Sequence, residues 1–184
     1  MHTEKVNAQD SLGATALLGA GLSEQLSVTG RYDVKCLDAD GNLKWEDSIE
    51  NLVVTVGKAN LLNVYLASST QTTAWYLGLV NGATSPTYAD ADTISSHAGW
   101  TESTAYSNAT RPQATFGTPT STNSISSSQA TFNINATATI AGALLVNNNT
   151  KGGTTGTLYS AGSFAVSREV ISGDSLLVTY TASV

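Results

Sequence analysis

The second half of the chain constrains the fold most strongly, because it consists of short strand-like segments. Apolar, β-branched and aromatic residues fill these segments after Pro112: QATFG, ATFNINA, ATIAGALLV, TLYSAGSF and SLLVTYTAS. Polar turn sequences separate the later segments at residues 120–128, 147–153 and 172–174. Short strands at regular spacing indicate a mainly β protein, a β-sandwich that we expect, by analogy, to be jelly-roll-like.

The first half predicts a hairpin and one short α-helix. Residues 30–47 alternate in polarity, and Asp40 with Gly41 supplies the positive φ that a tight turn needs. From residue 57 to residue 67 the apolar period becomes helical. The side chains expected on the apolar face of this helix are Leu61, Leu62, Tyr65 and Leu66.

A long excursion separates this helix from the strand-rich half. Residues 75–80 have the composition of a strand, whereas residues 83–111 follow no period. We interpret the latter as a loop anchored by Trp100 and Tyr106, and loops of that length usually have a function or make contacts. Residues 118–128, rich in Ser and Thr, are expected to form a surface loop.

Two regions are expected along the chain. Residues 1–29 carry small residues, glycines and leucines, and Leu18, Leu22 and Leu26 recur at helical spacing. Because each glycine costs a helix about 1 kcal/mol, we expect an extended N-terminal arm that is ordered only where it docks. Fully extended, it spans on the order of 95 Å, enough to touch a neighbouring subunit. Residues 30–184 are expected to form the β-sandwich domain.

Composition excludes several classes of partner. The net charge is −6 and the basic residues are scattered, which disfavours nucleic acid, since binding phosphates requires clustered Lys and Arg. Cys36 is the single cysteine, so it forms no internal disulfide and is interpreted as a small buried residue. No segment approaches eighteen apolar residues, and the first thirty residues do not read as a secretion signal. We expect a protein made in the cytoplasm with no membrane partner.

The two histidines, His2 and His97, limit acid–base chemistry. In sequence, His97 lies near Asp90, Asp92 and Glu102, the one place where a hydrolytic or divalent-metal site would form. No G-x-S-x-G motif and no His-x-x-x-His spacing accompanies it. We therefore predict no catalytic, metal-binding or cofactor-binding residues and no enzymatic activity.

Two further patterns imitate ligand-binding loops. Asp38, Asp40 and Asn42 resemble the start of a calcium loop, but Ile49 stands where that loop needs a glutamate, so a turn is predicted. Residues 151–156, KGGTTG, resemble a phosphate loop, but a strand-like segment follows where a helix is needed. We interpret them as a flexible connection between strands.

Carboxylates and aromatic residues each allow a second interpretation. The carboxylates around the hairpin favour a solvated acidic patch over the paired acids of a glycosidase. They are Asp38, Asp40, Glu46, Asp47 and Glu50. The large aromatic residues are expected mostly in the core, and a sugar-stacking platform is the alternative. They are Trp45, Trp75, Trp100, Tyr32, Tyr65, Tyr76, Tyr88 and Tyr106.

Several segments in a fixed order resemble structural proteins of tailed bacteriophage virions. The likeness runs from about Tyr32 onwards and leaves the arm uncovered. Its pieces are DADGNLKWED, ENLVVTVGKANLL, TTAWYLGLV, DTISSHAGWTE with the following Tyr106 and ATRP, FNINATATIAGALLV, NTKGGTTGTLYS and SGDSLLVTY. The resemblance implies a small β-rich virion component and assigns no functional residue.

Among such components, capsid decoration or cement proteins fit this chain best. The resemblance implies binding to the outside of the head, on the virion, after assembly in the host cytoplasm. The expected partners are the major capsid protein and copies of the chain itself, as a dimer or trimer. The alternatives are a tail- or fibre-associated virion protein and a carbohydrate-binding adhesin module.

Overall fold

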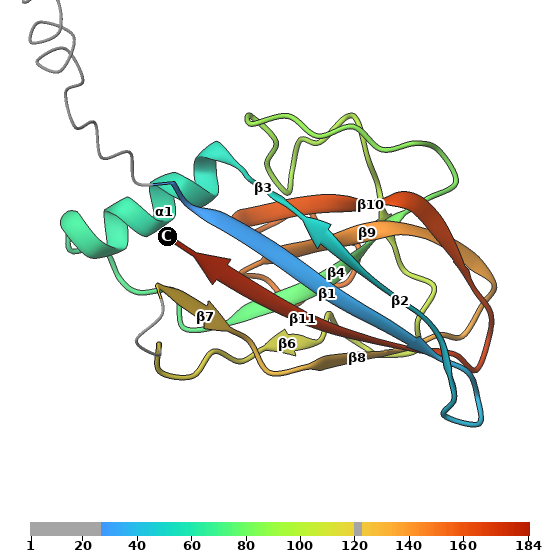
Figure 1. Ribbon diagram of the computed structural model, residues 1–184. Helices are drawn as coiled ribbons and strands as arrows, with labels where there is room; N and C mark the ends of the chain where they lie inside the picture. Colours follow the sequence, from blue (N-terminus) through green and yellow to red (C-terminus); the bar gives the residue numbers. More distant parts are fainter. Residues whose placement is uncertain (1–26, 120–122) are drawn as a thin grey trace, which may run out of the picture.

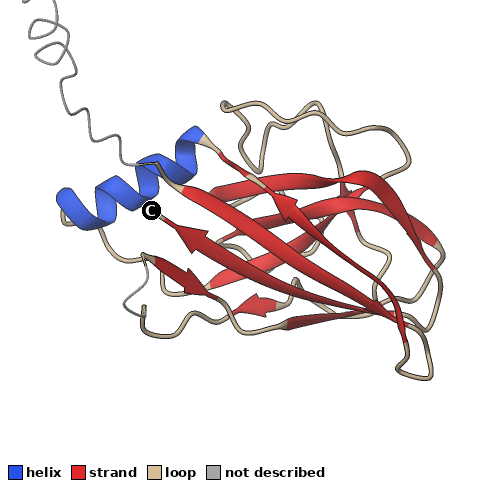
Figure 2. Cartoon of the chain, viewed as in Figure 1, coloured by secondary structure: helices blue, strands red, loops and turns tan. Residues whose placement is uncertain are grey.

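The structure, a computed structural model, describes residues 27–119 and 123–184 (Figure 1). Two antiparallel sheets pack face to face in it, and a helix lies at one end of them (Figure 2). This arrangement of two packed sheets and one helix confirms the expected mainly β fold, a jelly-roll-like sandwich with one short helix. Most of the predicted arm, residues 1–26, lies outside the described residues. Val28 packs against the core and Thr29 begins the first strand, so both belong to the folded body.

The first sheet is built around the first and last of the described strands. Its members are β1 (Thr29–Leu37), β2 (Leu43–Glu50), β7 (Ser124–Ser126), β8 (Ala130–Asn133) and β11 (Ser175–Ser183). The order is β2, β1, β11, β7, and β8 also pairs with β11. Tyr32 lies opposite Tyr180 and Val34 opposite Val178, and all four side chains are buried. The predicted hairpin is confirmed, because β1 pairs with β2 and Gly41 in its turn has φ of 85°.

The middle of the second sheet is buried on both faces. Its members are β3 (Leu52–Val53), β4 (Trp75–Asn81), β5 (Glu102–Ser103), β6 (Gln113–Ala114), β9 (Ala138–Val146) and β10 (Leu158–Val170). The order is β3, β10, β9, β4, β5, and β6 also pairs with β4. In β9 every residue from Ile140 to Val146 is buried. A strand covered on both sides needs such a continuous apolar run, which explains the sequence ATIAGALLV.

The long excursion covers the outer face of this second sheet. One core cluster fills the space between the sheets. A second joins Ala141, Leu144 and Val146 of β9 to Ile94 and Trp100 of the excursion. The predicted anchors are confirmed, since Trp100 and Tyr106 are both buried. Much of the excursion therefore serves as a packed layer of the fold.

Helix α1 (Thr55–Leu66) confirms the predicted helix and starts two residues earlier. Gly57 is its only buried residue. A Cβ at Gly57 would lie 2.3 Å from the carbonyl oxygen of Tyr159 in β10, so glycine is required for this close approach. The predicted apolar face lies mostly on the surface, because Leu62, Tyr65 and Leu66 are all exposed.

Two short strands depart from the sequence-based prediction: β5, within the excursion of residues 83–111, and β7. Within the stretch expected to be a surface loop, Ser124–Ser126 forms β7 and pairs with residues 181–183 of β11. This three-residue strand, Ser-Ile-Ser, is too short to show an apolar alternation in the sequence. Their backbone groups instead complete the edge of β11, whose neighbour β8 extends only along residues 175–178.

Candidate functional site

The structure does not bring His97 and the carboxylates near it in sequence together into one site. His97 stacks on Trp100, with ring centroids 3.8 Å apart, and its Nδ1 lies 2.9 Å from the Trp100 carbonyl oxygen. The indole N–H of Trp100 donates to Asp92 at 3.0 Å. Asp90 lies 3.7 Å from Lys58, and Glu102 binds an arginine. Each of these groups has a structural partner of its own. Across residues 27–119 and 123–184, no three His, Cys, Asp or Glu side chains form a metal-binding group.

Glu102 and Arg111 form a buried ion pair that sequence analysis missed. The Arg111 Nε donates to Glu102 Oε1 at 2.9 Å, and its Nη2 donates to Oε2 at 2.6 Å. Arg111 also donates to the carbonyl oxygens of Asn148 and Gly153, both at 2.9 Å. The arginine is 1% exposed, so this bidentate pair is desolvated. It ties the end of the long excursion to the loop between β9 and β10.

That loop is fixed at a second point by Lys151. Its ammonium donates to the carbonyl oxygens of Tyr106 at 2.8 Å and of Asn108 at 2.9 Å. It also lies 4.6 Å from the centre of the Tyr106 ring, a cation–π distance. Residues 151–156 belong to the connection between β9 and β10, as predicted, and Lys151 holds this connection in place. Contacts with residues far away in sequence hold this glycine-rich loop, and local composition does not reveal them.

A second buried carboxylate lies beside the cysteine. Asp174 Oδ2 accepts from the Lys44 ammonium at 2.6 Å and from the Ile171 N–H at 2.9 Å, and Cys36 Sγ lies 3.7 Å away. Burial, followed by the charge of Asp174, raises the pKa of Cys36 to about 12. The thiol is therefore protonated at neutral pH, which confirms its interpretation as a small buried residue and argues against a nucleophile.

Three of the five hairpin carboxylates, Asp38, Glu46 and Asp47, have partners of their own. The Asp38 side chain accepts from the backbone N–H groups of Asp40 and Asn42, and these hydrogen bonds, chiefly those from Asn42, lower its pKa. This closes the turn and confirms it over the calcium-loop alternative. The Arg168 guanidinium donates to Asp47 at 2.6 Å and lowers the pKa of that carboxyl. Glu46 pairs with Lys35 at 3.3 Å.

Most of the aromatic candidates are core residues. Tyr32 and Tyr106 are fully buried, and Trp100 is 3% exposed. Trp45 and Trp75 pack edge-on against Phe164 and Tyr159, respectively. Tyr65, on α1, is the one exposed large aromatic side chain within the described residues. The expectation of a mostly aromatic core is confirmed, and Trp100 is not available for stacking on a sugar.

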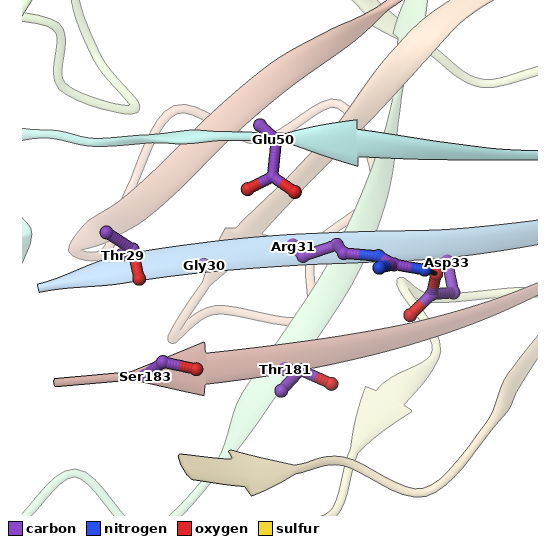
Figure 3. Close-up of a pocket in the computed structure, with 7 residues that line it drawn as sticks. All are labelled: Thr29, Gly30, Arg31, Asp33, Glu50, Thr181 and Ser183. Carbon is purple, nitrogen blue, oxygen red and sulfur yellow. Dashed lines mark hydrogen bonds and ion pairs between the residues drawn. The ribbon is translucent and has the colours of Figure 1, made fainter. Parts of the chain in front are cut away.

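The outer face of the first sheet carries an open, polar depression of about 370 Å³. Figure 3 shows Arg31 lying along β1 towards Asp33, with Glu50 on β2 and Thr181 and Ser183 on β11. Arg31 and Asp33 form an ion pair. No aromatic side chain lines the depression. Mixed charges that neutralise one another on an open sheet face do not define a ligand.

Uncovered apolar side chains lie at both ends of the sandwich. At one end is α1, with its exposed side chains. The other, which we call the hairpin end, consists of the turns at residues 38–44 and 171–174 (Figure 1). Leu43 is 54% exposed and Ile171 44% exposed there. A Cβ added at Gly173 would lie 3.3 Å from the Ala39 Cβ, so the two turns touch.

The described residues form a two-sheet β protein with one helix. Searches of protein-family models and of curated proteins found no match to the chain. α1 has 12 residues, and the described part of the chain contains no helix long and apolar enough to cross a membrane.

Proposed function

We propose that the chain is a phage virion structural protein, most specifically a capsid decoration or cement protein on the outside of the head. The observation that carries the proposal is the uncovered apolar surface of the hairpin end, set on a rigid sandwich. Leu43 and Ile171 flank the ion pair between Lys44 and Asp174, which fixes both turns in place. The resemblance of the sequence to virion proteins supplies the setting.

Exposed apolar surfaces on a folded body suit a protein that binds its partner at many identical interfaces. A decoration protein adds stability through many identical interfaces, and a standard interface buries about 800 Å² on each partner. The proposed partners are the major capsid protein and further copies of the chain, as a dimer or trimer placed on a symmetry axis. The N-terminal arm, residues 1–29, is proposed to add contacts.

A structural function, with no enzymatic activity, also agrees with the state of the polar groups. His97 is stacked, Cys36 is protonated, and the buried carboxylates are paired. Catalysis generally needs a base held beside a nucleophile and an orienting acid. The described residues use the same chemical groups to hold loops together.

Quantitative mass spectrometry of purified virions, separated into heads and tails, tests the proposal. Hundreds of copies in the head fraction are expected. A handful of copies in the tail fraction would instead assign the chain to the tail or fibre, and absence from virions would refute both placements. If the chain is absent from virions, a glycan array tests the adhesin alternative. Glycan binding that Tyr65→Ala removes would support that alternative.

Binding to heads that lack the protein tests the surface itself. Leu43→Asp places a charge in the proposed contact and should weaken binding at least about tenfold, the equivalent of about 1.4 kcal/mol. Ser48→Asp, also exposed on β2, is the matched control and should bind as the unaltered protein does. Equal binding by both variants would show that the hairpin end is not the contact.

A further inference from the structure

Helix α1 is unusually apolar for a surface helix. Its sequence, TVGKANLLNVYL, contains one charged residue, Lys58. A helix that is apolar on most sides is normally buried. Here Leu62 is 49% exposed, Tyr65 85% and Leu66 72%. These three side chains form one contiguous stripe, because they are spaced three and four residues apart. We call them the α1 stripe.

The body of the protein does not cover the α1 stripe. The helix is held at its beginning, where Gly57 meets the backbone of Tyr159 and the Thr55 N–H donates to the Asp90 carbonyl oxygen at 2.8 Å. In the middle of the helix, the Asn60 side chain lies 3.5 Å from the Thr72 hydroxyl. The second half of α1 therefore extends beyond the edge of the sandwich (Figure 2). The stripe needs a cover from outside the described body.

The chain preceding the described residues starts close to this helix. Gly30 accepts a hydrogen bond from the N–H of Asn51 at 3.1 Å, and α1 begins four residues after Asn51. Four residues span at most about 14 Å, so Gly30 lies close to the start of α1. The 26 residues before Ser27 are attached beside the uncovered helix, and fully extended they reach on the order of 85 Å.

The composition of that segment matches the stripe. Leucines recur through it at Leu12, Leu17, Leu18, Leu22 and Leu26. Leu18, Leu22 and Leu26 are spaced four apart, which places them on one side if the segment is helical when it docks. A short tether keeps the segment at an effective concentration in the millimolar range, so even a weak apolar contact is populated.

We propose that residues 12–26 dock on the α1 stripe of the same copy and cover it. The inference concerns the free protein and does not depend on the proposed virion function. Every copy carries both the segment and the helix, so copies packed side by side could exchange the contact between neighbours, as in domain swapping.

Hydrogen exchange of the full chain tests the docking from the side of the helix. In the unaltered protein, amides of residues 12–26 should exchange at least about tenfold more slowly than in a free peptide of the same sequence. The double variant Leu62→Asp with Leu66→Asp should remove this protection. Val166→Asp, at another exposed aliphatic residue, should leave it intact. Free-peptide rates in the unaltered protein would overturn the proposal.

Hydroxyl-radical footprinting of Tyr65 tests the docking from the side of the segment. Replacing Leu18, Leu22 and Leu26 by Ser should raise the modification rate of Tyr65 several-fold and leave exposed Leu43 unchanged. These substitutions lie outside the described residues, so they remove no described contact of the sandwich. The mass in solution completes the test: protection in a monomer supports docking within one copy. Protection present only in a dimer, and lost on dilution, would show that a second copy covers the stripe.

Discussion

Asp174 links the chemistry of one residue to the pH response of the protein. At the hairpin end, its carboxylate accepts hydrogen bonds from the Lys44 ammonium and from the Ile171 N–H. The Cys36 Sγ lies 3.7 Å from the same carboxylate. The hydrogen bond to Asp174 raises the pKa of Lys44, and burial raises that of Cys36. Both groups bind their protons more tightly in the folded state than in the unfolded state. Their contributions to stability are therefore present at neutral pH and are lost in alkali.

Cys36 makes this response measurable. An unperturbed thiol has a pKa of about 8.5, whereas the folded value is about 12. Stability from this group is complete below pH 8.5 and falls as the pH rises from there towards 12. Between pH 8 and pH 10, urea unfolding should show the unaltered protein losing about 1 kcal/mol more than Cys36→Ala loses. Tyrosine ionisation affects both proteins alike, and equal losses would contradict the assignment.

The buried ion pair allows a comparison with an exposed one. Arg111→Met leaves the Glu102 carboxylate buried without its partner and should lower the free energy of unfolding by about 3–5 kcal/mol. Lys35→Met removes the exposed pair with Glu46 and should cost less than about 1 kcal/mol. Denaturant unfolding of the two variants measures the difference. Similar losses would mean that the buried pair does not hold the loops.

At the scale of elements, α1 depends on one glycine. Alanine favours a helix over glycine by about 1 kcal/mol, but at position 57 its Cβ would collide with the backbone of β10. We expect Gly57→Ala to lower stability by about 1–3 kcal/mol through overpacking. Gly117→Ala is the control, because no atom lies within 4 Å of its added Cβ. Thermal unfolding gives both values, and a stabilised Gly57→Ala protein would contradict the packing.

Local patterns predicted the elements whose burial follows a simple period. The boundaries of β9 and β11 coincide with the segments ATIAGALLV and SLLVTYTAS, because one is buried on both faces and the other alternates. β7 was missed, since its pairing with β11 depends on a free backbone edge and not on its own side chains. A strand of three residues with one apolar side chain, Ile125, is too short to show a period.

The buried polar contacts were harder to predict than the strands, for a different reason. Arg111 meets backbone carbonyls near residues 148 and 153, and Cys36 meets a carboxylate at residue 174. Such contacts depend on how the sheets bring distant turns together, which composition and spacing do not encode. Sequence analysis did not find the buried pairs.

For the whole molecule, the two core clusters share strands and should unfold together. The cluster between the sheets and the one beneath the excursion both include residues of β9 and β10. Trp100 reports on the second cluster and Trp45 on the edge of the first. Single-tryptophan variants, with the other indoles replaced by Phe, should give coincident urea transitions, in agreement with circular dichroism. An earlier transition at Trp100 would show that the excursion unfolds separately.

The pairing of β1 with β11 has a consequence for how the protein is made. On the ribosome, the hairpin of β1 and β2 emerges first, while β11 emerges after every other described strand. Until β11 has emerged, the unpaired backbone groups on that edge of β1 can pair with a strand of another polypeptide. The sandwich is therefore completed only once β11 has been made. A translation product interrupted before residue 175 would keep this edge open, and we expect it to aggregate or to be degraded before it could assemble.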